Sequence, residues 1–237
     1  MALQILSDVH LEAPKAYDIF EITPKAPYLA LIRDIGNVVS HKGDFTAFLK
    51  RKSRQFRAVL FVPGNHEAYH SDWATTIDLL RAFDLFSSIP PEKEQAVSFG
   101  LNDFFQIDSW DVQAHNEAHL RAIAWLNAEV AHLEQLDTTT IVLSHWSPST
   151  DVRSVDPRHS ASPISSGFST DLSSQPCFQN KNFKVWAFGH THYNCDFMAD
   201  RRRDAGPLRL LTNRRDYFAQ ADGLDREEIV ALGSLSG

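Results

Sequence analysis

Short apolar runs alternate with helical patterns along the chain. Five runs have the length and the branched or aromatic composition of buried β-strands, and they cover residues 2–6, 28–32, 56–62, 140–143 and 183–188. Apolar residues at helical spacing predict helices over 42–55, 73–86 and 115–136, the second with Ser71 as its N-cap. Strands that alternate with helices are typical of an α/β fold.

Three further segments have weaker patterns. Apolar and polar residues alternate over 96–107, which predicts one or two antiparallel strands, and 208–217 is expected to contain closing antiparallel strands. The segment 149–182 is an insertion rich in serine and proline, with a short helical candidate at 165–172. It is either a disordered surface loop or a lid that shapes substrate specificity.

Composition narrows the class of protein. The 237 residues are enough for a single domain, which we expect to span 1–237, and 43% of them are hydrophobic. A net charge of −7 argues against general affinity for nucleic acid or for an anionic membrane. The run 201–203 is basic, but aspartates flank it, and we expect a solvated turn.

Cysteine usage and the N-terminal sequence indicate the compartment. Cys177 and Cys195 are too few for a disulfide scaffold and are expected to be free thiols. The chain runs from Met1 directly into the first predicted strand, and it has no apolar run long enough to cross a membrane. We therefore expect a soluble cytoplasmic protein.

Each of the five predicted strands ends in side chains that bind metals. These are Asp8, His10, Asp34, Asn65, His66, His145, His190 and His192. Ligands of open α/β sheets bind at the carboxyl ends of strands, so the side chains are expected to converge. Gly64, in the turn before Asn65, removes a side chain that would block close approach. His115, His119 and His132 follow no strand and are expected to be solvated.

The donor types indicate the metals. Imidazole, carboxylate and amide ligands together suit Mn, Fe, Zn, Co or Ni better than Ca. Eight candidates exceed the needs of one tetrahedral ion, so two divalent ions are expected.

The order of these motifs resembles the calcineurin-like metallophosphoesterase superfamily. The resemblance rests on Asp8-x-His10, Asp34, Gly64-Asn65-His66-Glu67, His145 and Gly189-His190-Thr191-His192. It implies a four-layer α/β fold, with two facing mixed β-sheets flanked by helices. It also implies that a hydroxide shared by two metal ions attacks phosphorus.

The resemblance assigns a role to each residue. Asp8, His10 and His192 would hold the first metal and Asn65, His145 and His190 the second, with Asp34 bridging the two. His66 would be the catalytic histidine beside the metals, which stabilises the phosphoryl group or protonates the leaving oxygen.

Three departures from the family pattern concern possible substrate contacts. Arg33 replaces the glycine that usually precedes the bridging aspartate, and we expect it to point outward, the alternative being contact with the phosphate. Asn37 replaces an aspartate that orients the catalytic histidine in the protein Ser/Thr phosphatase branch, so the chain is not assigned to that branch. The segment 213–217 resembles an Asn-Pro-Arg-Gly-Tyr motif, in which Arg215 is a candidate phosphate ligand.

The leading hypothesis is a metal-dependent phosphoesterase that acts on a small-molecule phosphate ester, either a monoester or a diester. The alternative is a non-catalytic scaffold that keeps the fold to bind proteins, as the retromer subunit of this superfamily does. A nuclease is disfavoured by the acidic balance. The sequence specifies neither the substrate, the native metal pair nor the oligomeric state.

Overall fold

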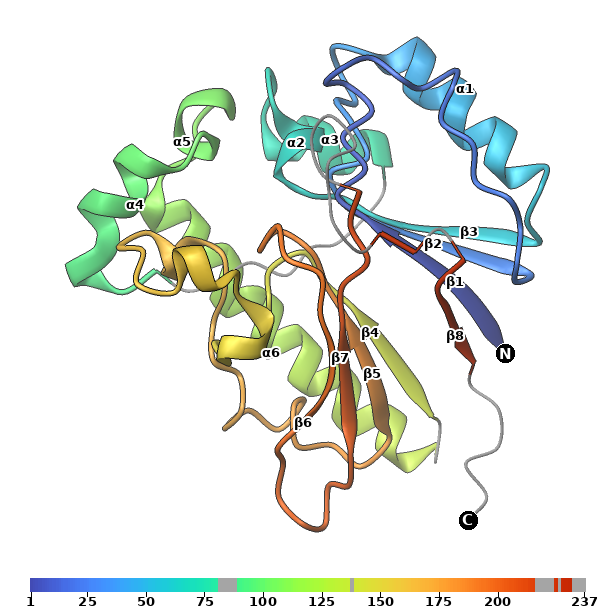
Figure 1. Cartoon of the computed structure of the whole chain (residues 1–237). Coiled ribbons are helices and arrows are strands. Elements are labelled where there is room, and N and C mark those ends of the chain that lie inside the picture. Colours follow the sequence, from blue (N-terminus) through green and yellow to red (C-terminus); the bar gives the residue numbers. More distant parts are fainter. Residues whose placement is uncertain (81–88, 137–138, 216–223, 226, 232–237) are drawn as a thin grey trace.

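Two four-stranded β-sheets face each other and carry helices on their outer sides (Figure 1). The computed structural model describes the chain except residues 81–88, 137–138, 216–223, 226 and 232–237. The first sheet has the order β3 (Ala58–Val62), β2 (Tyr28–Ile32), β1 (Ala2–Ser7), β8 (Ile229–Ala231). The second has the order β4 (Thr140–Leu143), β5 (Phe183–Ala187), β7 (Leu208–Leu211), β6 (Asp196–Ala199). The α/β fold predicted from the sequence is confirmed.

Side-chain alternation along the strands produces the layers. In β2, Leu29 and Leu31 belong to the core beneath helix α1 (Lys42–Ser53), where Phe45 and Phe48 also lie. Ala30 and the other inward-facing side chains pack against the second sheet. Because successive strand residues point to opposite faces, a strand that is apolar throughout is buried on both sides.

Helix α6 (Val112–Gln135) covers the other face of the second sheet. The side chain of Asp111 caps it by accepting a hydrogen bond from the backbone N–H of Ala114 at 2.8 Å. His115 is fully buried and meets the ring of Trp146 edge to face at 5.3 Å, and His119 is also buried. The expectation of solvated histidines was therefore wrong for these two; the rings of Phe104, Trp110 and Trp146 enclose His115. His132 is exposed as expected.

The segment predicted as antiparallel strands is helical. It forms α4 (Glu94–Gly100) and α5 (Asp103–Gln106), preceded by a 3₁₀ turn at Pro91–Lys93. Val97 and Leu101 lie four residues apart and pack together in one core cluster. The alternating pattern was misleading because the buried positions of this segment, Val97, Leu101, Asp103 and Ile107, form two pairs four residues apart, which is a helical spacing.

The remaining elements differ from prediction in their details. Helix α2 spans Asn65–Ala68, and α3 spans Trp73–Leu80, with its predicted continuation to 86 outside the described residues. Asp72, rather than Ser71, accepts the backbone N–H of Thr75 at the start of α3. Strand β7 is parallel to β5 and antiparallel only to β6, so it lies inside its sheet, and β8 was not predicted.

The insertion at 149–182 is folded, so the interpretation as a disordered loop is not supported. It contains 3₁₀ helices at Val152–Ser154, Pro157–His159 and Ser165–Gly167, the last within the predicted helical candidate. Leu172, Cys177 and Phe178 are buried in the core beneath α6.

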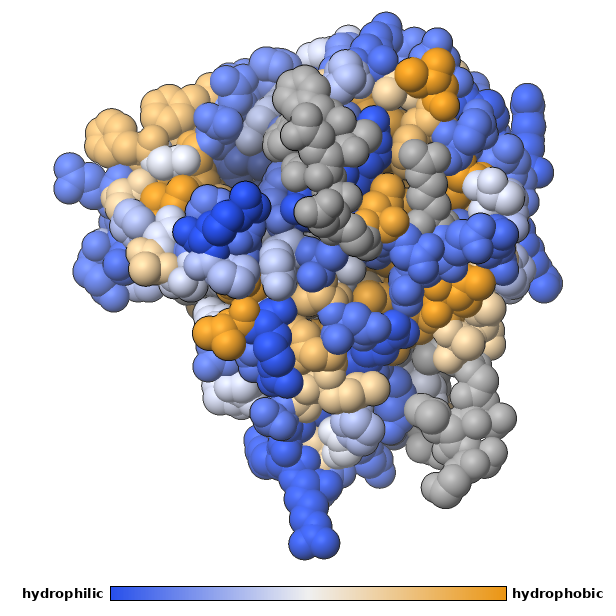
Figure 2. Space-filling view, in the orientation of Figure 1, coloured by the Kyte–Doolittle hydropathy of each residue, from blue (hydrophilic) through white to orange (hydrophobic). Residues whose placement is uncertain are grey.

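The following properties concern the helices, one face of the surface and the two thiols of the described residues. None of their helices has the length and apolar character required to cross a membrane. Figure 2 shows hydrophilic side chains over much of the viewed face, with hydrophobic ones in separate groups. Cys177 and Cys195 are free, and burial raises the pKa of each thiol to about 11.

Arg201 is a structural residue rather than part of a solvated turn. Its guanidinium donates to six backbone carbonyls, those of Phe178, Asn180, Phe183, Ala205, Gly206 and Pro207, at 2.8–3.2 Å. These carbonyls belong to the insertion end, to β5 and to the 205–207 loop, so one side chain joins three segments. Arg202 and Arg203 are exposed as expected.

We expect Arg201→Ala to lower the free energy of unfolding by about 2–4 kcal/mol, because several buried carbonyls would lose a charged donor. Arg203→Ala, a change of the same size at an exposed neighbour, should change it by less than ~0.5 kcal/mol. Urea denaturation followed by circular dichroism measures both, and equal values for the two variants would contradict the structural role of Arg201.

Candidate metal centre

The structure brings the metal-competent residues from all five strand ends to one place between the sheets. Among the described residues, three groups of side chains have ligand atoms within 4.8 Å of one another: Asp8 with His10 and His192, Asp34 with His145 and His190, and His10 with Glu12 and His66. The first group follows β1 and β5, and the second follows β2, β4 and β5. Each group therefore combines segments that are distant in sequence.

Asn65 joins the second group through its amide oxygen. Nε2 of His145 lies 2.6 Å from Oδ1 of Asn65 and 3.7 Å from Oδ2 of Asp34. The amide nitrogen of Asn65 donates to Oδ1 of Asp103 at 2.7 Å, which turns the amide oxygen toward His145. Asp103 also accepts the hydroxyl of Tyr69 at 2.9 Å. Asp103 thus orients a candidate ligand.

The backbone at these positions is strained. Five candidate ligands and Arg33 have positive φ angles between 44° and 69°, a backbone region that residues other than glycine rarely adopt. These residues are Asp8, His10, Arg33, Asp34, His190 and His192. Such strain concentrates at functional sites, where the surrounding structure imposes it.

Two glycines allow the turns to approach each other. A Cβ at Gly64 would collide with Oδ1 of Asp34, and a Cβ at Gly189 would collide with Oδ2 of Asp8. The expected role of Gly64 is therefore specific: it makes room for a carboxylate of the site itself.

Burial sets the charge of the site. It lowers the pKa of His10 to about 4 and that of His145 to about 3, and it lowers the pKa of His190 well below its usual value. These imidazoles are therefore neutral near pH 7 and each offers a lone pair. Burial, followed by the charges of Glu67 and Asp8, raises the pKa of Asp34 well above its usual range. A cation placed here would offset that cost.

Several buried atoms of the site lack hydrogen-bond partners. Among the described residues, Oδ2 of Asp8, Oδ2 of Asp34 and both ring nitrogens of His190 have none. Buried polar atoms are nearly always satisfied, so these atoms call for ligands of another kind. Divalent cations fit the arrangement, and the mixture of nitrogen and oxygen donors suits Mn, Fe, Zn, Co or Ni.

Glu67 links the turns that follow strands β2 and β3 through hydrogen bonds. Its carboxylate accepts the backbone N–H groups of Asp34, Ile35 and Gly36 at 2.8–3.1 Å, and also that of Gly64. It therefore holds the Asp34 turn against the Asn65 turn.

Glu12 contacts two histidines at once. Its Oε1 lies 2.8 Å from Nδ1 of His66 and 3.1 Å from Nδ1 of His10. Because a carboxylate accepts hydrogen bonds, both Nδ1 atoms carry the hydrogen, and Nε2 of each ring is turned away from Glu12. His66 also stacks on Tyr69, with ring centroids 4.3 Å apart. Glu12 thus sets the orientation of a candidate ligand and of the candidate catalytic histidine.

The three residues considered for substrate binding lie in different surroundings. Arg33 is fully buried with its guanidinium 5.6 Å from the Trp146 ring, so the expected outward orientation was wrong. Asn37 donates to the backbone carbonyl of His66 at 2.7 Å rather than to its ring. Arg215 donates to the carbonyl of Val9 at 2.6 Å and lies over the Phe20 ring. Arg215 therefore supports the turn that carries Asp8 and His10.

Sequence reasoning missed three carboxylates that hold the site. Glu12 continues the two-residue spacing of Asp8 and His10, and Glu67 lies within the recognised motif, so both had a signal in the sequence. Asp103 had none, because its segment was predicted to be strand.

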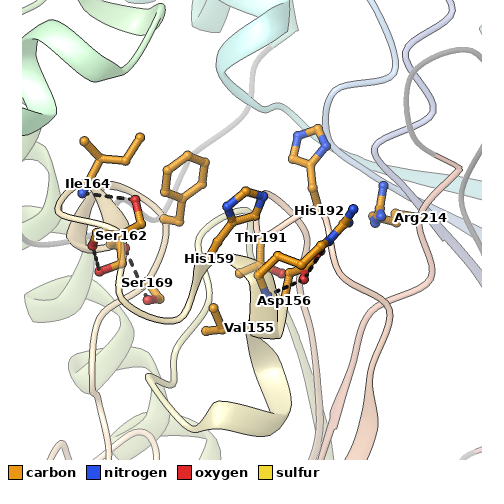
Figure 3. A pocket seen from close by; sticks show the side chains of 12 residues that line it. Val155, Asp156, His159, Ser162, Ile164, Ser169, Thr191, His192 and Arg214 are labelled. Atoms are coloured by element: carbon orange, nitrogen blue, oxygen red, sulfur yellow. Dashed lines mark hydrogen bonds and ion pairs between the residues drawn. The ribbon is translucent and has the colours of Figure 1, made fainter.

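Two hollows meet at the site. The smaller has a volume of about 160 Å³ and is lined by Asp34, Asn65, His66 and His190, among others. The larger has a volume of about 440 Å³ and is lined mainly by the insertion (Figure 3). Phe168 and His192 line both hollows, so these two side chains mark where they adjoin.

Two facing sheets with buried imidazole and carboxylate groups at their strand ends define an α/β fold with a candidate metal centre. The family model for calcineurin-like phosphoesterases matches residues 1–194, and the chain belongs to that family of metal-dependent phosphoesterases. An uncharacterized protein, L509, of Acanthamoeba polyphaga mimivirus is 25% identical over 98% of this chain and 97% of its own length.

Solved structures support the same fold. The phosphopantetheinyl hydrolase PptH from Mycobacterium tuberculosis has a TM-score of 0.66 at 14% identity, over 91% of this chain and 89% of that one. A dimetal phosphatase from Danio rerio has a TM-score of 0.54 at 11% identity, over 90% and 87% of the two chains.

We expect Asp103→Ala to weaken binding of the metal near Asn65 by about 10–100-fold, because the amide would lose its carboxylate partner and keep only the Tyr69 hydroxyl, at 3.0 Å, to orient its oxygen. Asp108→Ala, at an exposed aspartate of the same segment, is the control. Titration of the metal-free protein with Mn²⁺, followed by calorimetry, measures the affinity. An unchanged affinity in the Asp103 variant would show that Asp103 does not orient the ligand.

Proposed function

We propose that the protein hydrolyses phosphate monoesters or diesters at a pair of divalent metal ions. The observation that carries the proposal is the adjacency of the two ligand groups. The backbone N–H of Asp8 donates to the carbonyl of Arg33 at 3.0 Å, and that of His10 donates to the carbonyl of Asp34 at 2.7 Å. These bonds join the turn of the first group to that of the second, which supports Asp34 as the bridging ligand.

The ligand assignment follows these groups. Asp8, His10 and His192 would hold one ion and Asn65, His145 and His190 the other, with Asp34 shared. When bound, the two metal ions would lower the pKa of a shared water and so supply the hydroxide that attacks phosphorus. They would also offset negative charge on the phosphoryl oxygens. Manganese is the first metal to test.

We propose that His66 protonates the leaving group. Its ring lines the 160 Å³ hollow together with Asp34 and Asn65. The bond to Glu12 holds the proton on Nδ1, so Nε2 is the atom that can face a substrate oxygen. The stacked ring of Tyr69 limits rotation of the imidazole. A second proton on Nε2 would then be delivered to the departing oxygen.

The scaffold hypothesis predicts loss of ligands or of the catalytic histidine, and the chain retains them all.

The two free cysteines are in keeping with a reducing compartment such as the cytoplasm. Comparing p-nitrophenyl phosphate with bis-p-nitrophenyl phosphate separates monoesterase from diesterase activity.

With Mn²⁺ added, we expect the wild type to hydrolyse at least one of these two esters. His66→Ala should lower kcat by about 10²–10⁴-fold because the leaving oxygen loses its proton donor. His132→Ala, at an exposed histidine, should leave kcat unchanged. Metal content measured by elemental analysis should be the same in all three proteins. A metal-loaded wild type that cleaves no phosphate ester would overturn the proposed function.

Glu12→Gln should lower kcat by about 10–100-fold, since an amide holds the Nδ1 hydrogen of His66 less strongly than a carboxylate does. KM for the same ester should change little, because Glu12 lies behind the histidines. Asp18→Asn is the control, an exposed acidic residue on the same loop. A change confined to KM would contradict the positioning role.

A further inference from the structure

The 440 Å³ hollow beside the metal centre is a built pocket. Phe168, on its insertion wall, stacks on the ring of His190 with centroids 4.7 Å apart. The backbone of Ser147 pairs with the insertion, donating to the carbonyl of Phe168 at 3.1 Å and accepting from Thr170 at 3.0 Å. Nε1 of Trp146 donates to the carbonyl of Gly167 at 2.8 Å. The wall is thus anchored to the strand end that carries His145.

Helix α4 supports the wall from behind. Gly167 packs so closely on Leu101 and Val97 that a Cβ there would press on both side chains. Ile164 and Phe168 pack against the same core cluster. The pocket is therefore formed before any ligand arrives, which lowers the entropic cost of binding.

The chemistry of the lining is mixed. Val155, Ile164 and Phe168 supply apolar surface, and the lining also includes the polar residues Ser162, Ser165, Ser169 and Thr191. The hydroxyls of Ser165 and Ser169 donate to the backbone carbonyls of Ser162 and Ser165, at 2.9 Å and 3.4 Å. Arg158 is paired with Asp156 at 2.6 Å, so these two charges offset each other. In Figure 3, His192 lies between the insertion residues and Arg214, which is on the far side of the pocket.

The size of the pocket exceeds the needs of a phosphate group. The smaller hollow, where the candidate ligands and His66 lie, would accommodate the reacting phosphate under the proposed function. A volume of about 440 Å³ falls within the range of sites that bind small organic molecules, ~300–1,000 Å³.

We propose that this pocket binds the alcohol part of the substrate, and that the substrate is a small organic phosphate ester with a bulky alcohol part carrying both apolar surface and hydrogen-bonding groups. The inference rests on the proposed function and adds the substrate class. The phosphate lies among the metal ligands, and the alcohol part extends past Phe168 and His192 into the insertion pocket. Inorganic phosphates and esters of very small alcohols leave the pocket unfilled and bind more weakly.

Non-hydrolysable phosphonates test the pocket apart from catalysis. With the Mn²⁺-loaded protein, we expect naphthylmethylphosphonate to bind at least about 10-fold more tightly than methylphosphonate by calorimetry, because the ring buries apolar surface. Equal affinities in the wild type would overturn the inference without any variant being needed.

Two variants test whether the pocket causes the preference for the larger phosphonate. Val155→Trp and Ser162→Trp fill the pocket from separate positions and should abolish the preference for the larger phosphonate while leaving methylphosphonate affinity unchanged. Ser174→Trp, at an exposed position of the same insertion, should keep the preference. Equal weakening of both phosphonates by both pocket variants would also overturn the inference.

The two proposals fail in different ways. If the wild type hydrolyses p-nitrophenyl phosphate but shows no size preference, only the pocket assignment is wrong. If no ester is hydrolysed while the phosphonates bind with the expected preference, the pocket assignment holds as a binding site and the proposed function is wrong.

Discussion

Burial of several metal-competent side chains at one point is the constraint on which this structure depends. Asp8 and Asp34 lie among imidazoles whose pKa values burial lowers, so these imidazoles provide little positive charge to balance the carboxylates. Burying several hydrogen-bond acceptors and carboxylates together in a region of low dielectric costs free energy, and bound cations offset this cost. The left-handed backbone at these positions adds strain that the strands on either side must hold.

A second layer of carboxylates keeps the ligands in place. Glu67 fixes backbone positions, Asp103 orients an amide, and Glu12 orients two imidazoles. Each acts on a different kind of group, and each comes from a different segment of the chain. The position where the protein Ser/Thr phosphatase branch has an aspartate is filled here by Asn37, whose side chain donates to the backbone carbonyl of His66. Glu12 supplies the carboxylate contact to His66 from another direction.

The insertion lies directly against the candidate metal centre. Phe168 contacts the ring of His190 on one side and lines the larger pocket on the other. A substrate that fills the pocket therefore lies next to a candidate metal ligand.

The sequence by itself determined the buried strands and the polar residues that follow them, because strand length, composition and turn residues are local properties. Asp8, Asn65 and His190 were identifiable in this way. Only the tertiary structure decided which carboxylates support them: Asp103 reaches Asn65 from a helix that local alternation had indicated as strand. It also decided that Arg33 and His115 are buried, since burial depends on segments that meet only after folding.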